Sequence, residues 1–135
     1  MADEIFFVLF LNRQLLRDFV EMISGYIADY DIGTSDEPSF QVDNYFEKNG
    51  ILKRVAIPSW VQRAVFHRDR GMCVHCSKDI SGLVSVSSIE NFDHMIPLAK
   101  GGINDVTNIQ LLCESCNKSK KDKIEQLSSK YEKWF

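Results

Sequence analysis

Two Cys-x-x-Cys pairs constrain this chain more than any other feature. The first pair is Cys73 and Cys76, the second is Cys113 and Cys116, and the sequence contains no further cysteine. Each pair can turn two thiolates towards one tetrahedral ion, so two pairs supply the four ligands of a closed zinc site. Disulfides and a thioredoxin-type redox motif are the alternatives. We predict a structural Zn²⁺, because nothing suggests secretion and no βαβ pattern surrounds either pair.

The remaining composition is that of a globular domain. The chain has 135 residues, of which 44% are hydrophobic and 26% charged, which suits one ordinary domain or a small module with an extension. The longest apolar run covers residues 5–11 and is far shorter than the roughly 20 residues that cross a bilayer. Asp3 and Glu4 precede it, where a signal peptide would carry positive charge. We expect a soluble, cytoplasmic protein with no membrane contact.

The charges divide the chain into two unequal parts. Residues 1–52 hold three basic residues against ten acidic ones, whereas residues 53–135 hold thirteen basic residues against nine acidic ones. A surface that binds phosphate groups is therefore expected in the second part.

Helical spacing of apolar residues predicts a helix over residues 12–30, followed by a loop at 31–39 and a short amphipathic segment at 40–46. A second helix is expected to begin near Pro58, since proline suits the first helical turn. We expect Gly71 at the left-handed position after its end. The apolar face of this helix should comprise Trp60, Val61, Ala64 and Val65.

The two cysteine pairs are separated by 36 residues, whereas a plain zinc ribbon places them about 15 to 20 apart. We predict that this excess forms two strands, at residues 87–95 and 108–113. A helix should begin at the second pair, and a terminal amphipathic helix should cover 124–135. A zinc ion at the cysteines would then bring four polar residues together: Asp93, His94, Asn108 and Asn117.

The run from Phe92 to Lys121 resembles the HNH endonuclease family, whose core is the ββα-metal fold. The matching features are Asp-His-x-x-Pro at residues 93–97, Lys-Gly-Gly at 100–102, an Asn at 108 and Cys-x-x-Cys-Asn-x-x-Lys at 113–120. The flanking cysteine pairs match the zinc-containing branch of that family. The resemblance covers about residues 68–121 and leaves the first 57 residues unmatched.

The resemblance implies a role for each of these residues. Asp93 and Asn117 would be ligands of a catalytic Mg²⁺ or another divalent ion, and His94 would be the general base that activates water. Asn108 would bond the loop backbone and so orient His94. Asn117 occupies the position of the second histidine in the His-Asn-His motif that gives the family its name. Its amide oxygen is a hard ligand that suits Mg²⁺, although it could also merely occupy the start of a helix.

Basic residues near these motifs are candidates for phosphate contacts that position nucleic acid without reading its sequence. The alternative is that they form a solvated face. The candidates are Lys100, Lys118, Lys120, Lys121, Arg68 and Arg70.

The sequence thus predicts an α+β protein in two parts. Residues 1–57 would form a mainly α-helical extension that packs on the core or binds a second copy or a protein partner. Residues 58–135 would form the ββα-metal HNH domain, held together by the four-cysteine zinc site. Its expected function is metal-dependent hydrolysis of phosphodiester bonds, with DNA as the first candidate substrate. The alternative is a non-catalytic zinc module that binds nucleic acid or protein.

Overall fold

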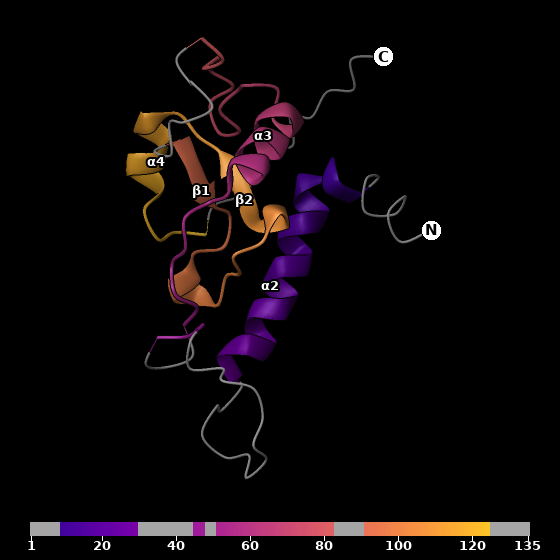
Figure 1. Cartoon of the computed structure of the whole chain (residues 1–135), viewed down its shortest axis with the longest axis vertical. Coiled ribbons are helices and arrows are strands. Elements are labelled where there is room, and N and C mark those ends of the chain that lie inside the picture. Colours follow the sequence, from indigo (N-terminus) through magenta and orange to yellow (C-terminus); the bar gives the residue numbers. More distant parts are fainter. Residues whose placement is uncertain (1–8, 30–44, 48–50, 83–90, 125–135) are drawn as a thin grey trace.

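A computed structural model describes residues 9–29, 45–47, 51–82 and 91–124 (Figure 1). The predictions for the loop at 31–39 and the terminal helix beyond residue 124 lie outside the described residues, as do most of those for residues 5–11 and 40–46. The described part is α+β, as predicted. It contains, in chain order, α2 (Arg13–Asp29), α3 (Ser59–Arg68), β1 (Phe92–His94), the 3-10 helices η3 (Leu98–Lys100) and η4 (Val106–Asn108), β2 (Ile109–Leu111) and α4 (Glu114–Lys120).

The two strands form an antiparallel pair that leads directly into α4. Phe92 lies opposite Leu111, Asp93 opposite Gln110, and His94 opposite Ile109. A strand is present in each predicted range. Residues 87–90 of the first range lie outside the described residues, β2 is shorter than its predicted range, and Asn108 lies in η4, just before β2. The order strand, strand, helix fits the ββα-metal architecture that the resemblance implies.

Helix α3 begins one residue later than predicted, with Pro58 as its N-cap. Val61 and Val65 are buried as expected, but Trp60 is 58% exposed, so its assignment to the apolar face is wrong. The helix ends in a Schellman-type turn, in which Gly71 N–H bonds Phe66 O and Arg70 N–H bonds His67 O. The C′ position therefore belongs to Arg70 (φ 57°) and not to Gly71 (φ 65°), which follows it. Both residues take the left-handed conformation.

The end of α3 is joined to β2 by a buried ion pair. The guanidinium of Arg68 donates to both carboxylate oxygens of Asp69, at 2.8 and 2.9 Å. It also donates to Ile109 O at 2.6 Å, while Leu111 N–H donates to Asp69 at 3.0 Å. Every buried charge here has partners, which is the condition for tolerating an ion pair in a core. Because α3 leads into the first cysteine pair, this connection also fixes that pair relative to the strands.

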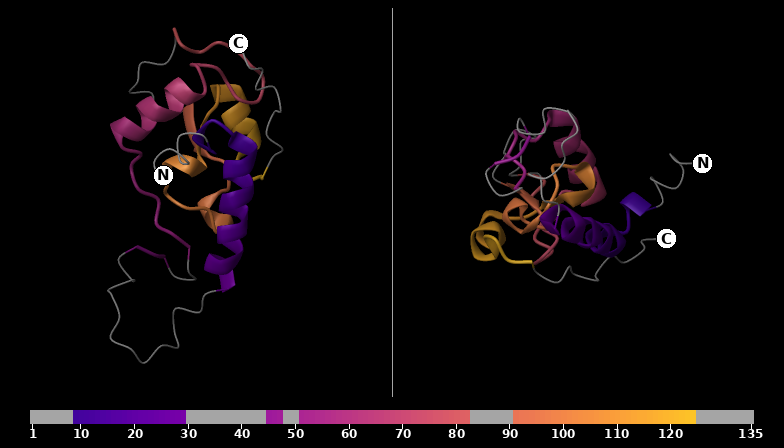
Figure 2. Two further views of the ribbon diagram at one scale, coloured as in Figure 1. Left: turned by 90° about the vertical axis from the view of Figure 1, so that its right-hand side faces the viewer. Right: turned by 90° about the horizontal axis from the view of Figure 1, so that it is seen from below.

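Helix α2 lies along one side of the core, as two perpendicular views show (Figure 2). Leu16 and Val20 are buried on its inner face, and the helix packs against η4. The Arg68 guanidinium lies 5.1 Å from the centre of the Phe10 ring, which precedes the helix. The described part of the extension therefore packs on the HNH-like region. No described helix has the length and apolar character needed to cross a membrane.

The turn between β1 and η4 requires both of its glycines. Gly101 ends η3 with φ 80°, and a Cβ there would lie 2.8 Å from Ser24 O of α2. A Cβ on Gly102 would lie 1.9 Å from Ile96 O, a distance that no side chain can occupy. The glycines allow the chain to fold back tightly, so that Asn108 returns beneath the end of β1.

Candidate active site and metal centre

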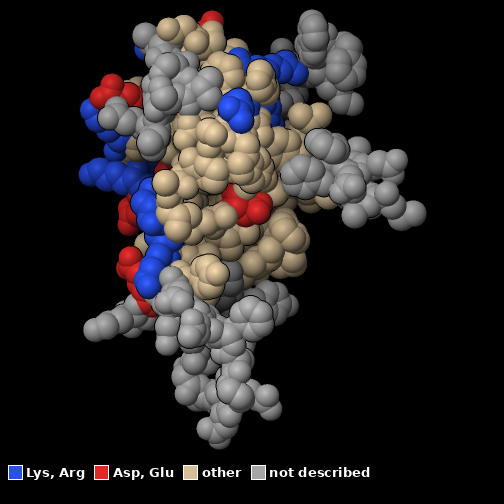
Figure 3. Space-filling model, viewed as in Figure 1, with Lys and Arg blue, Asp and Glu red and all other residues tan. Residues whose placement is uncertain are grey.

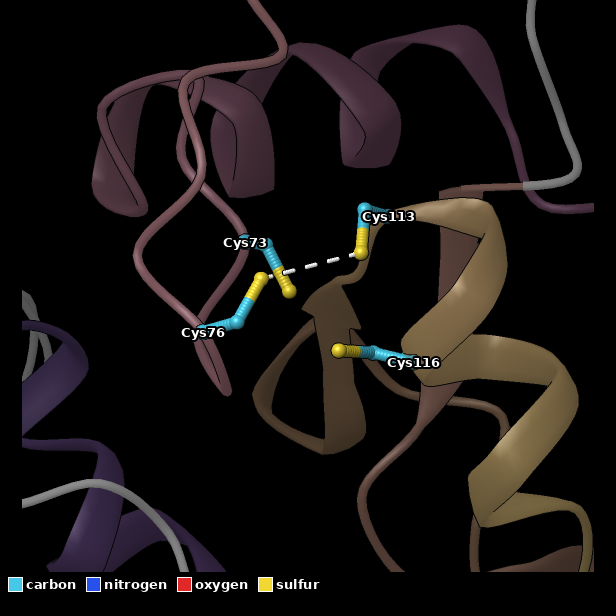
Figure 4. A group of neighbouring side chains, drawn as sticks. All are labelled: Cys73, Cys76, Cys113 and Cys116. Atoms are coloured by element: carbon cyan, nitrogen blue, oxygen red, sulfur yellow. Dashed lines mark hydrogen bonds between the residues drawn. The ribbon is translucent and has the colours of Figure 1, made fainter.

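The four cysteines form one compact cluster. Their sulfur atoms all lie within 4.8 Å of one another, and Cys76 and Cys113 are 3.7 Å apart (Figure 4). Tetrahedral zinc with bonds of about 2.3 Å separates its sulfur ligands by about 3.8 Å. Cys73 and Cys76 come from the turn after α3, and Cys113 and Cys116 come from the start of α4. The cluster therefore has the composition and geometry of a zinc site.

The environment of the thiols favours a cation at their centre. Burial opposes ionisation of Cys113, but hydrogen bonds from the Ser115 hydroxyl and the Cys116 backbone N–H outweigh it and lower the pKa of Cys113 to about 6. Burial and the neighbouring sulfurs raise the pKa of Cys116. One thiolate thus forms readily while the next is penalised, and a divalent ion would remove that penalty.

Asp93 and His94 lie at the end of β1 and line one open cleft of about 720 Å³. Asn117 lines the same cleft from α4, and its rim includes Lys121. Three of the four polar residues singled out in the sequence therefore face one space, and the fourth supports it from behind.

His94 is almost completely buried, with 2% of its surface exposed. Burial is the main cause that lowers its pKa, against a hydrogen bond with Asn104 that raises it. Nε2 lies 3.2 Å from Asn104 Oδ1, while Nδ1 is buried with no hydrogen-bond partner among the described residues. The ring also borders a second, smaller cavity of about 140 Å³.

Asn108 is fully buried and ties the turn together. Its Nδ2 donates to Ile96 O and Ile103 O, at 2.9 and 3.0 Å. Its Oδ1 accepts from Ile96 N–H at 2.9 Å, and its backbone oxygen accepts from Met95 N–H at 2.7 Å. These bonds hold Met95 and Ile96, the two residues that follow His94. A residue that orients His94 from the protein interior would make such bonds.

Lys120 makes a contact that the sequence does not suggest. Its ammonium lies 2.8 Å from Asp93 Oδ2 and 2.9 Å from His94 O, and the residue is 1% exposed. Gln110 Nε2 approaches the same Asp93 oxygen at 3.5 Å. One ammonium thus holds both residues of the Asp-His pair, and one carboxylate oxygen of Asp93 is engaged inside the protein.

Two of the six predicted phosphate contacts are wrong. Lys120 is buried against Asp93, and Arg68 is 3% exposed and paired with Asp69, so neither side chain can reach a nucleic acid. The other four, Lys100, Lys118, Lys121 and Arg70, are exposed. Lys118 is paired with Glu114 on α4. Lys and Arg side chains gather on the side of the molecule where α4 lies, with acidic side chains among them (Figure 3).

The cleft also contains residues that the sequence assigned to the extension. Residues 54–57 form one wall of it, so the predicted boundary between residues 57 and 58 separates residues that share a site. Asn104 was missed as well: it contacts His94 and also donates to Lys53 O at 2.9 Å. One feature of the sequence indicated Asn104: it closely follows the double glycine, in the turn expected after the Asp-His pair. Nothing in the sequence indicated Lys53.

The arrangement fits a ββα-metal unit beside a four-cysteine cluster. Residues 73–123 match the family model described as HNH endonuclease. This segment contains both cysteine pairs, the Asp-His pair, Asn108 and Asn117, so the match confirms the resemblance stated from the sequence. Searches of curated proteins and of solved structures gave no match.

Proposed function

We propose that the protein is a metal-dependent endonuclease that hydrolyses phosphodiester bonds in nucleic acid, with DNA as its first candidate substrate. One observation supports this most directly: Asp93, His94 and Asn117 line a single open cleft, although they come from two different elements. A carboxylate, an imidazole and an amide oxygen are the groups that metal-assisted phosphodiester hydrolysis requires. The cysteine cluster would take no part in this reaction, because four thiolates leave zinc no open position.

The chain's own residues would divide the work as follows. Asp93 offers the cleft one carboxylate oxygen, because Lys120 engages the other, and Asn117 offers its amide oxygen from α4. These hard donors suit Mg²⁺, which takes few protein ligands and keeps waters and phosphate oxygens. When bound, the ion would stabilise negative charge on the phosphate and on the leaving 3′ oxygen.

His94 would remove a proton from the attacking water at its free ring nitrogen, since its pKa is lowered and the ring is neutral near pH 7. The oxygen of that water bonds phosphorus while the bond to the 3′ oxygen breaks. The 3′ oxygen then takes a proton from solvent water, which leaves a 5′ phosphate and a 3′ hydroxyl. Nδ1 is covered in the described structure. We therefore expect the wall formed by residues 54–57 to shift when nucleic acid enters the cleft.

A cleavage assay with end-group analysis tests this proposal. The zinc-loaded chain should cut single-stranded or duplex DNA when Mg²⁺ is present and stop when EDTA is added. His94→Ala should lose about 10² to 10⁴ in kcat, the range for a general base. His67→Ala is the matched control, because His67 is exposed on α3. Cleavage that survives His94→Ala would sink the mechanism.

A second candidate function is nucleic-acid binding without cleavage. The observation that favours it is the burial of His94 together with the pairing of Asp93 to Lys120, since both residues already have structural partners. This function predicts a retained affinity for DNA or RNA with no cleavage of any form. The same assay, extended to RNA and accompanied by a binding titration, separates the two functions.

The proposal that residues 1–57 bind a second copy or a protein partner stays a prediction. The described part of the extension exposes apolar side chains along one face of α2, at Leu15, Phe19 and Met22. A second copy would also bring a second cleft, which cutting both strands of a duplex in one event requires. Light scattering on the full chain tests it, and a strict monomer at high concentration counts against a homodimer.

A further inference from the structure

We infer that Asn104 is a positioning residue that fixes His94 in the Nε2–H tautomer, and that Lys53, in the segment leading into α3, orients Asn104 for this task. The inference deepens the proposed function and rests on it for its catalytic meaning. Its structural content stands on the hydrogen bonds among Lys53, Asn104 and His94.

The direction of each hydrogen bond follows from its end groups. Lys53 contributes a backbone carbonyl, which can only accept, so the group of Asn104 that lies 2.9 Å from it must be the Nδ2 amide. The other end of the same amide is Oδ1, which lies 3.2 Å from His94 Nε2. An amide oxygen can only accept, so in the neutral ring the proton must be on Nε2.

The consequence is that Nδ1 carries the lone pair. Nδ1 is also the ring nitrogen without a hydrogen-bond partner among the described residues. A general base needs an unprotonated nitrogen that no other group occupies. Asn104 therefore leaves free the nitrogen that can accept a proton from water, and a reversed tautomer would leave His94 unable to act there.

The His94 end of this hydrogen bond lies inside the protein, whereas Asn104 itself is exposed. The smaller cavity beside His94 is lined by Asn104, Asp105 and apolar side chains, including Val55 and Ile109. Because His94 is 2% exposed, water has little access to its imidazole N–H, and a hydrogen bond is stronger where water is scarce. Gly102 and the side-chain cap that Asp105 supplies to η4 fix the backbone on either side of Asn104.

The arrangement gives the region before α3 a part in the site. Lys53 lies outside the segment that matches the family model, and Asn104 lies inside it. The bond between them is one of the contacts that hold residues 54–57 against the cleft. An HNH-like segment cut from this chain at residue 58 would therefore keep its zinc site and lose part of the control over its base.

Nuclear magnetic resonance of the zinc-loaded full chain, labelled with ¹⁵N histidine, tests the inference without any substrate. At a pH where the ring is neutral, the wild type should show His94 with Nε2 protonated and Nδ1 unprotonated, and the imidazole proton should exchange slowly with water. The signals of His94 are assigned by their loss in His94→Gln. A wild-type ring protonated on Nδ1 would overturn the inference.

Two substitutions of Asn104 sharpen the test. Asn104→Leu removes the acceptor and should make the imidazole proton exchange faster and admit the Nδ1–H tautomer. Asn104→Asp keeps an acceptor and should retain the wild-type tautomer, although it loses the donor to Lys53. An unchanged ring in Asn104→Leu contradicts the inference. Zinc content and the far-ultraviolet circular dichroism spectrum show that each variant is folded.

Cleavage kinetics then connect the tautomer to activity. Asn104→Leu should lower kcat about ten- to a hundredfold with little change in KM, because the ring would spend less time with a usable lone pair. Asn104→Asp should restore most of kcat. If the wild type shows the Nε2–H tautomer and Asn104→Leu disturbs it, but no nucleic acid is cut, then the inference about the ring holds and the proposed function fails.

Discussion

The cysteine cluster and the Asp-His cleft are two metal-directed regions built in opposite ways. The cluster is closed: four like ligands come from two short local motifs, and their sulfurs lie within 4.8 Å of one another. The cleft is open: its donors are a carboxylate, an imidazole and an amide, and its walls come from β1, α4 and the segment before α3. The first region can hold the fold together, and the second can leave space for substrate.

The two regions are mechanically linked through α4. Cys113 and Cys116 fix the start of that helix, while Asn117 and Lys120 lie on its following turn and reach the cleft. A substitution in the cluster would therefore displace Asn117 and Lys120. A substitution in the cleft need not disturb the cluster. Substitutions in the two regions should therefore differ in their effects on folding and on activity.

Cys113→Ser should have the largest effect. A structural zinc contributes on the order of 10 kcal/mol to folding in small modules, which is comparable with the whole stability of a domain. We expect loss of bound zinc and of a cooperative thermal transition, and chelation of zinc from the wild type should do the same. Ser119→Ala, on the exposed face of α4, is the control. A cooperative, zinc-free Cys113→Ser chain would refute a structural role for the cluster.

The same difference explains how much of the molecule the sequence could predict. The cysteine spacing and the Asp-His and Asn motifs are local, and they predicted the four-cysteine cluster, the ββα order and the segment that matches the HNH family model. Lys120 and Arg68 were misread because a lysine or arginine looks like a surface charge unless its buried partner is known. Asp93 lies 27 positions before Lys120, and only the folded chain brings them together. Asn104 and Lys53 were missed for the same reason.

Lys120→Met should destabilise the cleft region by about 2 kcal/mol, since it removes two hydrogen bonds of a charged group and leaves Asp93 without its partner. Met keeps most of the volume, so packing should change little. Lys121→Met is the matched control, because Lys121 is the exposed neighbour. Chemical denaturation of both variants measures the difference, and zinc content should stay at the wild-type level. Equal stability of the two variants would show that the ammonium of Lys120 contributes nothing to the fold.

Acidity should act on the cleft through protonation of His94. Burial lowers the pKa of His94 below its usual 6.5, so the unfolded chain takes up this proton more readily than the folded chain. Activity and the free energy of unfolding should therefore be steady through neutral pH and decline only as the pH falls below about 6.5. The profile of kcat/KM against pH, with stability measured in the same buffers, checks this. An acid limb centred above 6.5 would contradict the burial of the ring.

The exposed lysines should give the smallest effect, and it should appear in the salt dependence of binding. Each phosphate contact adds about 0.9 to the slope of log affinity against log salt for duplex DNA. Lys121 is exposed at the rim of the cleft, so Lys121→Ala should reduce the slope by about one contact. Lys118 is already paired with Glu114, so Lys118→Ala should change it less. Because both side chains are exposed, both variants should keep wild-type zinc content. Equal slopes for the two variants would place the nucleic acid on a face other than the one where Lys121 meets the cleft.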